Sequence, residues 1–276
     1  MKQTLASSAT THTSDTKPAQ TVSNSGILLR RLAVPVGLFV LWVLVTLYEV
    51  FEPSQLPGPL EVVKTGWNML ISNKLPPHIL ASSWRVFAGF GVGSFLAIVL
   101  GLLVGLSRNA EDLLAPTLQA VRAIPSLAWV PLLILWMGID EASKVTLVAI
   151  GVFFPVYTNL VSGIRQIDRK LVEVGFAYGL KGRALAQQVL LPAALPSLLT
   201  GLRSGLAQGW LFLVAAELIA ASRGLGFLLT DGQNSGRADI IVLSILLLAL
   251  LGKLTDWLLS LVERRLLRWT DSYSGR

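Results

Sequence analysis

Several stretches of the sequence are apolar over about 20 residues, with few charges inside them. A helix of that length crosses the hydrocarbon core of a bilayer and satisfies its own backbone hydrogen bonds there. Only 14% of the residues are charged, whereas soluble domains have roughly 25%. We therefore expect an all-α polytopic membrane protein with about six transmembrane helices. The expected spans are residues 32–50, 86–106, 116–138, 145–164, 196–221 and 239–262.

Proline and glycine positions add detail to these spans. Pro125 and Pro131 lie in the third span and Pro155 lies in the fourth, so we expect kinks there. Glycines at four-residue spacing in the second and fifth spans predict close helix packing. They are Gly89, Gly93, Gly101 and Gly105 in the second span, and Gly201, Gly205 and Gly209 in the fifth.

The basic residues predict how the chain is oriented in the membrane. Fourteen of the 23 Lys and Arg residues lie in one set of alternate segments outside the spans, and five lie in the opposite set. Because cytoplasmic loops are enriched in Lys and Arg, this bias places both termini and the loop 165–195 in the cytoplasm. The net charge of +7 is thus explained by basic residues at the cytoplasmic ends of the spans. Because these residues do not form a single patch, we expect no nucleic-acid partner.

The composition also divides the chain into parts. The Ser-, Thr- and Gln-rich start is typical of a disordered tail. The first apolar run is too long for a signal peptide and lacks a cleavage site. No cysteine is present, and His12 and His78 are isolated, so we expect no metal site. The expected parts are a cytoplasmic tail (1–27), the first transmembrane helix with a periplasmic loop (28–78), the transmembrane core (79–264) and a cytoplasmic C-terminal tail (265–276).

The loop between the fourth and fifth spans has the pattern of two short helices joined by a turn. Apolar and small residues recur at i, i+3, i+4 and i+7 from Leu171 to Tyr178, which predicts a first helix with an apolar face. Gly179 and Gly182 permit a sharp turn, because glycine adopts positive φ without a Cβ clash. A second helix is expected from about Arg183 to Leu190, ending before Pro192. Such a hairpin is suited to docking in a partner's groove.

This loop resembles the EAA signature of the permeases of binding-protein-dependent ABC importers: Glu-Ala-Ala, three residues, Gly, nine residues, Ile, one residue, Leu-Pro. Glu173, Gly179, Leu191 and Pro192 match it, while Val174, Gly175 and Val189 replace the two alanines and the isoleucine. The resemblance implies the ABC type I importer permease fold, a permease homodimer and a periplasmic substrate-binding protein. It also implies that loop 165–195 couples the permease to a separate ATP-binding cassette ATPase subunit. The residues expected in this coupling loop are Glu173, Gly175, Tyr178, Gly179, Lys181, Gly182 and Pro192.

In detail the chain resembles the aliphatic sulfonate permeases, within a group that also serves taurine and nitrate. The segments 131–141, 154–157, 163–169 and 250–256 carry this likeness. It implies that the substrate is an aliphatic sulfonate, and the alternative substrates are taurine, nitrate or another small anion. A less favoured alternative is that the protein is an ion-coupled secondary transporter. The chain has no Gly-x-x-x-x-Gly-Lys-Ser/Thr stretch to hold phosphates. We therefore expect a transport subunit that is not an enzyme and binds no cofactor, with ATP used by its partner.

Four charged residues have two interpretations each. Glu173 either contacts the ATPase or supports its own helix beside Lys170. Glu217, inside the fifth span, either lies near the transport path or is hydrogen-bonded between helices. Arg122 and Arg203 either attract an anionic substrate or extend from the cytoplasmic ends of their spans to the interface.

Overall fold

The computed structural model describes residues 24–52 and 54–268, and all regular elements within these ranges are helical. The described residues form two compact units, which divide between Val50 and Phe51. In the first unit, α1 (Asn24–Leu47) contains Pro35, and most of its large apolar side chains from Leu32 onward are exposed, as suits a helix in lipid. The predicted tail over 1–27 lies outside the described residues except at its end, where α1 already begins, and residues 269–276 also lie outside them.

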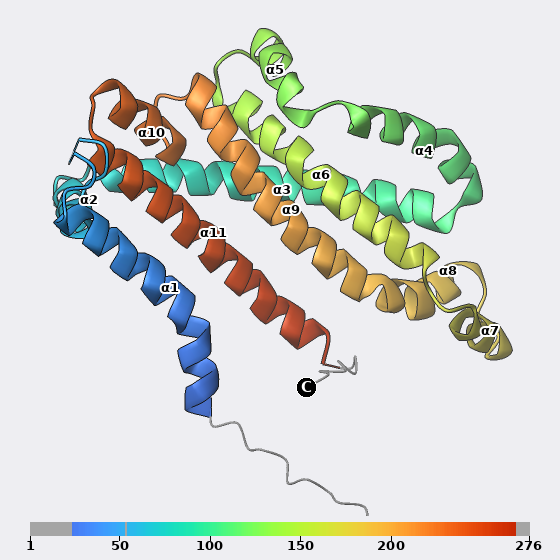
Figure 1. Ribbon diagram of the computed structural model, residues 1–276. Coiled ribbons are helices and arrows are strands. Elements are labelled where there is room, and N and C mark those ends of the chain that lie inside the picture. Colours follow the sequence, from blue (N-terminus) through green and yellow to red (C-terminus); the bar gives the residue numbers. More distant parts are fainter. Residues whose placement is uncertain (1–23, 53, 269–276) are drawn as a thin grey trace, which may run out of the picture. The chain divides into compact units, whose positions relative to one another are not determined.

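The second unit contains the remaining helices (Figure 1). They are α2 (Pro59–Ile71), α3 (Leu75–Leu106), α4 (Arg108–Ala123), the 3-10 turn Ser126–Ala128, α5 (Trp129–Met137), α6 (Glu141–Arg165), α7 (Arg169–Ala177), α8 (Gly182–Leu185), the π-helical turn Ala186–Leu190, α9 (Leu191–Ala220), α10 (Leu225–Asn234) and α11 (Ala238–Leu266).

Four helices in the described part of the chain are long and apolar enough to cross a membrane. They are α3, α6, α11 and the continuous segment Gly182–Ile219, which includes α9. These four match predicted spans. The polytopic all-α architecture is therefore confirmed.

The third predicted span, residues 116–138, is a bent pair of helices, and the kink predicted at Pro125 is confirmed. The chain bends by 80° between α4 and the segment containing α5. Pro125 lacks a backbone N–H and disfavours helical backbone at the residue before it, and Ile124 is accordingly extended, with φ −72° and ψ 124°. The count of spans in the described residues is thus four, or five if the bent pair is one span.

Helix α6 forms the centre of the second unit, because it packs against both α3 and α9. The predicted glycine rows lie at these contacts. A Cβ on Gly93 of α3 would be 2.5 Å from the backbone oxygen of Ala149 in α6, and one on Gly205 of α9 would be 3.2 Å from that of Val152. Both rows therefore permit helix approaches that any larger residue would obstruct.

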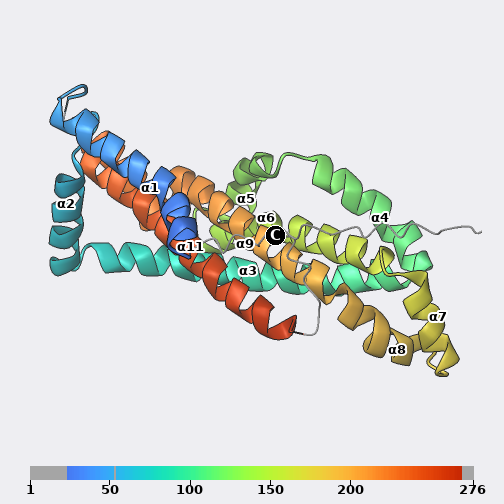
Figure 2. The ribbon, with the colours of Figure 1, turned by 60° about the horizontal axis from the view of Figure 1, so that its bottom comes forward.

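Two shorter helices, α2 and α10, were not predicted. They lie at the end of the second unit opposite to α7 and α8 (Figure 2). Thr65 of α2 donates a 2.6 Å hydrogen bond to Asp239 at the start of α11, and Leu225 and Leu228 of α10 are buried beside Ile240. With 13 and 10 residues, respectively, neither helix has the length of apolar sequence that marks a span.

Candidate functional site

The loop 165–195 contains the predicted helical hairpin. Asp168 is the N-cap of α7, and its side chain accepts a hydrogen bond from the backbone N–H of Lys170. At the other end, Gly179 has φ +77°. The N–H of Gly179 donates to the oxygen of Phe176 and that of Leu180 donates to the oxygen of Gly175, at 2.9 and 3.0 Å. This Schellman pattern confirms the sharp turn.

Gly175 lets the two arms of the hairpin touch. A Cβ at this position would lie 2.6 Å from Cδ1 of Leu185 and 3.3 Å from Cγ2 of Val189. Leu185 is buried by this contact. Gly182 also has positive φ, at +51°, where α8 begins. Glycines thus fix both the turn and the separation of the arms.

The second arm of the hairpin does not end before Pro192, as predicted, but continues into the membrane helix. Helix runs from Gly182 to Ile219 over 38 residues, and Pro192 is the second residue of α9. The π-helical turn Ala186–Leu190 lies just ahead of this proline. Proline has no backbone N–H to donate, and in a regular α-helix its ring clashes with the carbonyl four residues earlier. The wider π-helical turn moves that carbonyl away from the ring, so the helix continues through Pro192. The hairpin is consequently joined to α9 without a flexible linker.

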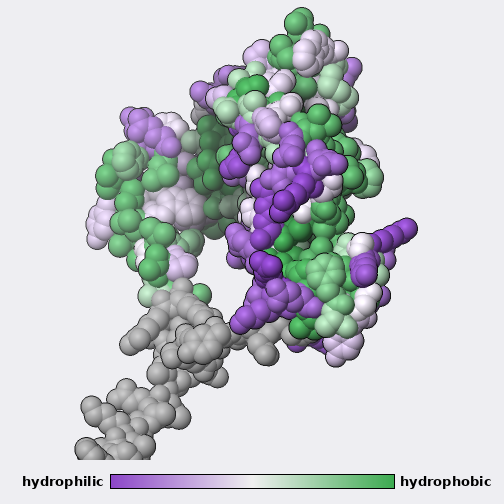
Figure 3. All heavy atoms as spheres, turned by 90° about the vertical axis from the view of Figure 1, so that its right-hand side faces the viewer, coloured by the Kyte–Doolittle hydropathy of each residue, from purple (hydrophilic) through white to green (hydrophobic). Residues whose placement is uncertain are grey.

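The outer surface of the hairpin is both apolar and charged. Tyr178 is 83% exposed, and Val174 and Phe176 are each about half exposed. Glu173 pairs with Arg169 at 3.1 Å, one helical turn away, rather than with Lys170. The face of the second unit on the side of α7 and α8 presents both hydrophilic and hydrophobic side chains (Figure 3). Exposed aromatic residues among charges are typical of a surface that binds a protein partner.

At the opposite end of the second unit, Glu217 belongs to a buried ionic cluster. Its side chain is fully buried, and Oε1 accepts a 2.6 Å hydrogen bond from Nη1 of Arg85 in α3. Ser82 Oγ donates to the same carboxylate at 2.8 Å, and the backbone N–H of Gly226 donates to Oε2 at 2.8 Å. Ser82 Oγ in turn accepts from the N–H of Leu225. Glu217 is therefore hydrogen-bonded between helices, which favours the structural interpretation.

Arg85 joins this cluster to α6. Its Nε and Nη2 donate to the carboxylate of Glu141 at 2.5 and 2.6 Å, and its Nη1 also donates to the backbone oxygen of Arg223. Lys144 contacts Glu141 at 3.4 Å, so two cations balance two carboxylates. Sequence reasoning missed Arg85 and Glu141. The detectable signal was Arg85, a buried arginine within the apolar helix α3 and costly there unless paired. Glu141, the exposed first residue of α6, gave no such signal.

The two candidate arginines of the transport path differ in their surroundings. Arg203 donates to Asp256 at 3.0 Å and to Glu263 at 2.9 Å, both in α11. Its charge is already compensated, which favours the structural interpretation. Arg122 is exposed near the end of α4 and lines a polar cleft together with Arg165 of α6.

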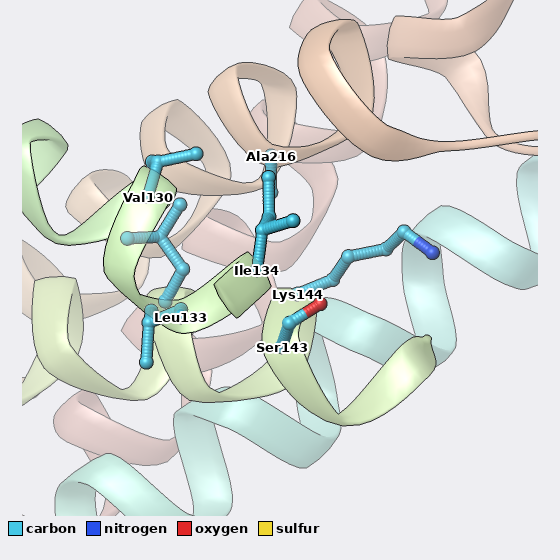
Figure 4. Close-up of a pocket in the computed structure, with 7 residues that line it drawn as sticks. Val130, Leu133, Ile134, Ser143, Lys144 and Ala216 are labelled. Carbon is cyan, nitrogen blue, oxygen red and sulfur yellow. The ribbon is translucent and has the colours of Figure 1, made fainter. Parts of the chain in front are cut away.

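A small cavity lies between α5, α6 and α9 (Figure 4). Its volume is about 10 Å³, which is no larger than the space needed for one water molecule. Val130, Leu133 and Ala216 form apolar walls, while the amine of Lys144 extends away from them. This cavity is too small to hold a substrate.

Comparison with known proteins agrees with these features. Residues 93–268 match the family described as "Binding-protein-dependent transport system inner membrane component". An aliphatic sulfonates transport permease protein, SsuC, of Escherichia coli is 45% identical over 87% of this chain and 91% of its own length. The protein of the same name in Bacillus subtilis is 39% identical over 90% of each chain. A taurine transport system permease protein, TauC, of E. coli is 32% identical over 88% of this chain and 91% of its own length.

The family match covers the packed bundle, the hairpin and α11, and these relatives cover most of the chain. The chain therefore belongs to the family of binding-protein-dependent transport system inner membrane components and is the permease subunit of an ABC importer.

Proposed function

We propose that this permease carries an aliphatic sulfonate across the inner membrane. The observation that carries the proposal is the 45% and 39% identity to two proteins named for aliphatic sulfonates, each over about nine-tenths of the chain. Identity to the taurine relative is lower, at 32%. Taurine itself is a sulfonate, so a cleft for one such anion is chemically close to a cleft for the other.

We further propose that the hairpin α7–α8 docks on an ATP-binding cassette ATPase. The coupling residues are Glu173, Gly175, Tyr178, Gly179, Lys181, Gly182 and Pro192. The exposed Tyr178 and Phe176 and the fixed turn at Gly179 support this role, because a rigid amphipathic hairpin loses little conformational entropy on docking. The ATPase hydrolyses ATP, and a periplasmic protein delivers the substrate. Two copies of the permease surround the path.

The proposed orientation places both termini and the hairpin in the cytoplasm. The distribution of Lys and Arg supports it. Reporter fusions after residue 180 and at the C-terminus should report cytoplasm, and a fusion near residue 70 should report periplasm. A periplasmic signal from the hairpin would exclude its contact with a cytoplasmic ATPase.

Growth tests the substrate. A strain without this permease should not use alkanesulfonates as its sulfur source and should still grow on sulfate. Complementation with the wild-type chain should restore growth. Normal growth on alkanesulfonates with lost growth on taurine would assign the permease to taurine instead.

A further inference from the structure

A cleft between α4 and α6 has two compartments, which share Leu118 and Phe154 as walls. The larger compartment has a volume of about 490 Å³ and the smaller about 160 Å³. The cleft lies where α4 diverges from α6, ahead of the 80° bend that leads to α5 (Figures 1 and 2). The larger compartment alone is within the range of about 300–1,000 Å³ that small-molecule sites occupy.

The larger compartment is almost wholly apolar. Val92 and Leu96 of α3, Phe153 of α6 and Trp129 at the start of α5 are among its walls. Its polar groups are the hydroxyl of Thr146 and the indole N–H of Trp129. That N–H is buried and has no hydrogen-bond partner among the described residues. The compartment therefore offers an environment for a short hydrocarbon chain.

The smaller compartment is polar and positively charged. Arg122 of α4 and Arg165 of α6 line it, together with Gln119, Tyr157 and Ser162. Arg165 pairs with Glu111 at 2.7 Å, whereas no ion pair of Arg122 is present within the described residues. Two cations and one carboxylate leave one positive charge uncompensated. One singly charged anion would balance it.

We propose that the α4–α6 cleft binds the transported alkanesulfonate, with its alkyl chain in the apolar compartment and its sulfonate at Arg122 and Arg165. An alkanesulfonate has an apolar chain and a monoanionic head, the same two chemistries that the adjoining compartments offer. The planar guanidinium of Arg122 donates paired hydrogen bonds to oxyanions. This assignment rests on the proposed function and makes Arg122 a residue that determines specificity.

The head of the substrate is tested with Arg122→Gln and a matched control, Arg108→Gln. Both arginines are exposed residues of α4, but Arg108 lies at the first turn, outside the cleft. Proteoliposomes would contain the full transporter with its ATPase and binding protein. Arg122→Gln should raise the KM for butane-1-sulfonate uptake about tenfold, the loss expected for one charged hydrogen-bond partner. Arg108→Gln should leave the KM unchanged.

The position of the substrate's alkyl chain is tested with Val92→Trp and its control Val99→Trp. Both valines are partly exposed on α3, and only Val92 lines the apolar compartment. Each methylene buried in that compartment should lower the KM about fourfold. The binding protein is the same in all samples, so the ratio of the variant's KM to the wild-type KM reports the effect of the permease alone. Val92→Trp should impair hexane-1-sulfonate uptake far more than methanesulfonate uptake, and Val99→Trp should impair neither.

The outcomes separate the two proposals. A wild-type transporter that moves no sulfonate would overturn the proposed function and this assignment together. Normal wild-type uptake with equal effects of Arg122→Gln and Arg108→Gln would overturn the assignment alone. So would a chain-length profile of Val92→Trp that is identical to that of Val99→Trp. An Arg122→Gln effect that appears only in vesicles with anionic phospholipid would assign the cleft to a lipid instead.

Discussion

Replacement of Gly179 tests whether the hairpin couples the permease to its ATPase. The backbone there has φ +77°, and a Cβ would meet no atom within 4 Å, so a side chain fits sterically and only the backbone is strained. A β-branched residue in this conformation costs about 1–2 kcal/mol. If the turn relaxes in Gly179→Val, docking on the ATPase must restore the strained conformation. The cost of that strain is subtracted from the binding free energy, so ATPase binding should weaken about 5- to 30-fold.

Gly236 provides a matched control. It lies in the turn before α11 with φ +65°, and a Cβ there would also meet no atom within 4 Å. Gly236→Val therefore imposes a similar strain far from the hairpin. Gly179→Asn is a second control, because asparagine tolerates left-handed backbone.

The assay compares membrane levels, ATPase retained on purification in mild detergent, and substrate uptake. Gly179→Val should reach the membrane at normal levels, and its bound ATPase and its uptake should fall together. Gly179→Asn and Gly236→Val should keep both. Full uptake by Gly179→Val, or equal losses in Gly236→Val, would refute the reasoning.

Three further predictions concern single contacts. Glu217→Ala leaves Arg85 with a buried, partly uncompensated charge and should destabilise the protein by about 3–5 kcal/mol. Glu141→Ala should destabilise it less, because the side chain of Glu141 is 58% exposed. Thermal unfolding in detergent measures both variants, and equal losses of stability would contradict the argument from burial. Gly93→Ala should lower the unfolding temperature, because its Cβ would lie 2.5 Å from a backbone oxygen of α6, and Gly91→Ala, with open space around it, should not. Glu173→Ala removes an exposed ion pair and should change stability by at most about 1 kcal/mol; a larger loss in the same unfolding assay would show a buried role.

The sequence was most informative where one local property decides the structure. Long apolar runs identified α3, α6, α9 and α11, because only helices satisfy their backbone within a bilayer. The turn at Gly179 was predictable since a glycine between two apolar patterns indicates positive φ.

Prediction failed where the answer depends on distant residues. Arg85 and Glu217 are 132 positions apart, and nothing in either neighbourhood identifies the partner. Pro125 and Pro192 carry the same local signal, and the kink predicted at Pro125 is present, whereas the helix end predicted before Pro192 is not. The difference is the π-helical turn ahead of Pro192. Arg122 was selected for its charge, but its neighbour Arg165 across the cleft could be recognised only in three dimensions.

The unbroken helix from Gly182 to Ile219 has a mechanical consequence. At 1.5 Å per residue, its 38 residues extend about 57 Å. The hairpin is attached to one end, and Glu217 is held by Arg85, Ser82 and Gly226 near the other. Between these ends α9 packs along α6, with Gly201 and Gly205 at the contact, so α9 can tilt only together with α6. One degree of tilt of the packed α6–α9 pair about the end that contains Glu217 corresponds to a displacement of about 1 Å at the hairpin.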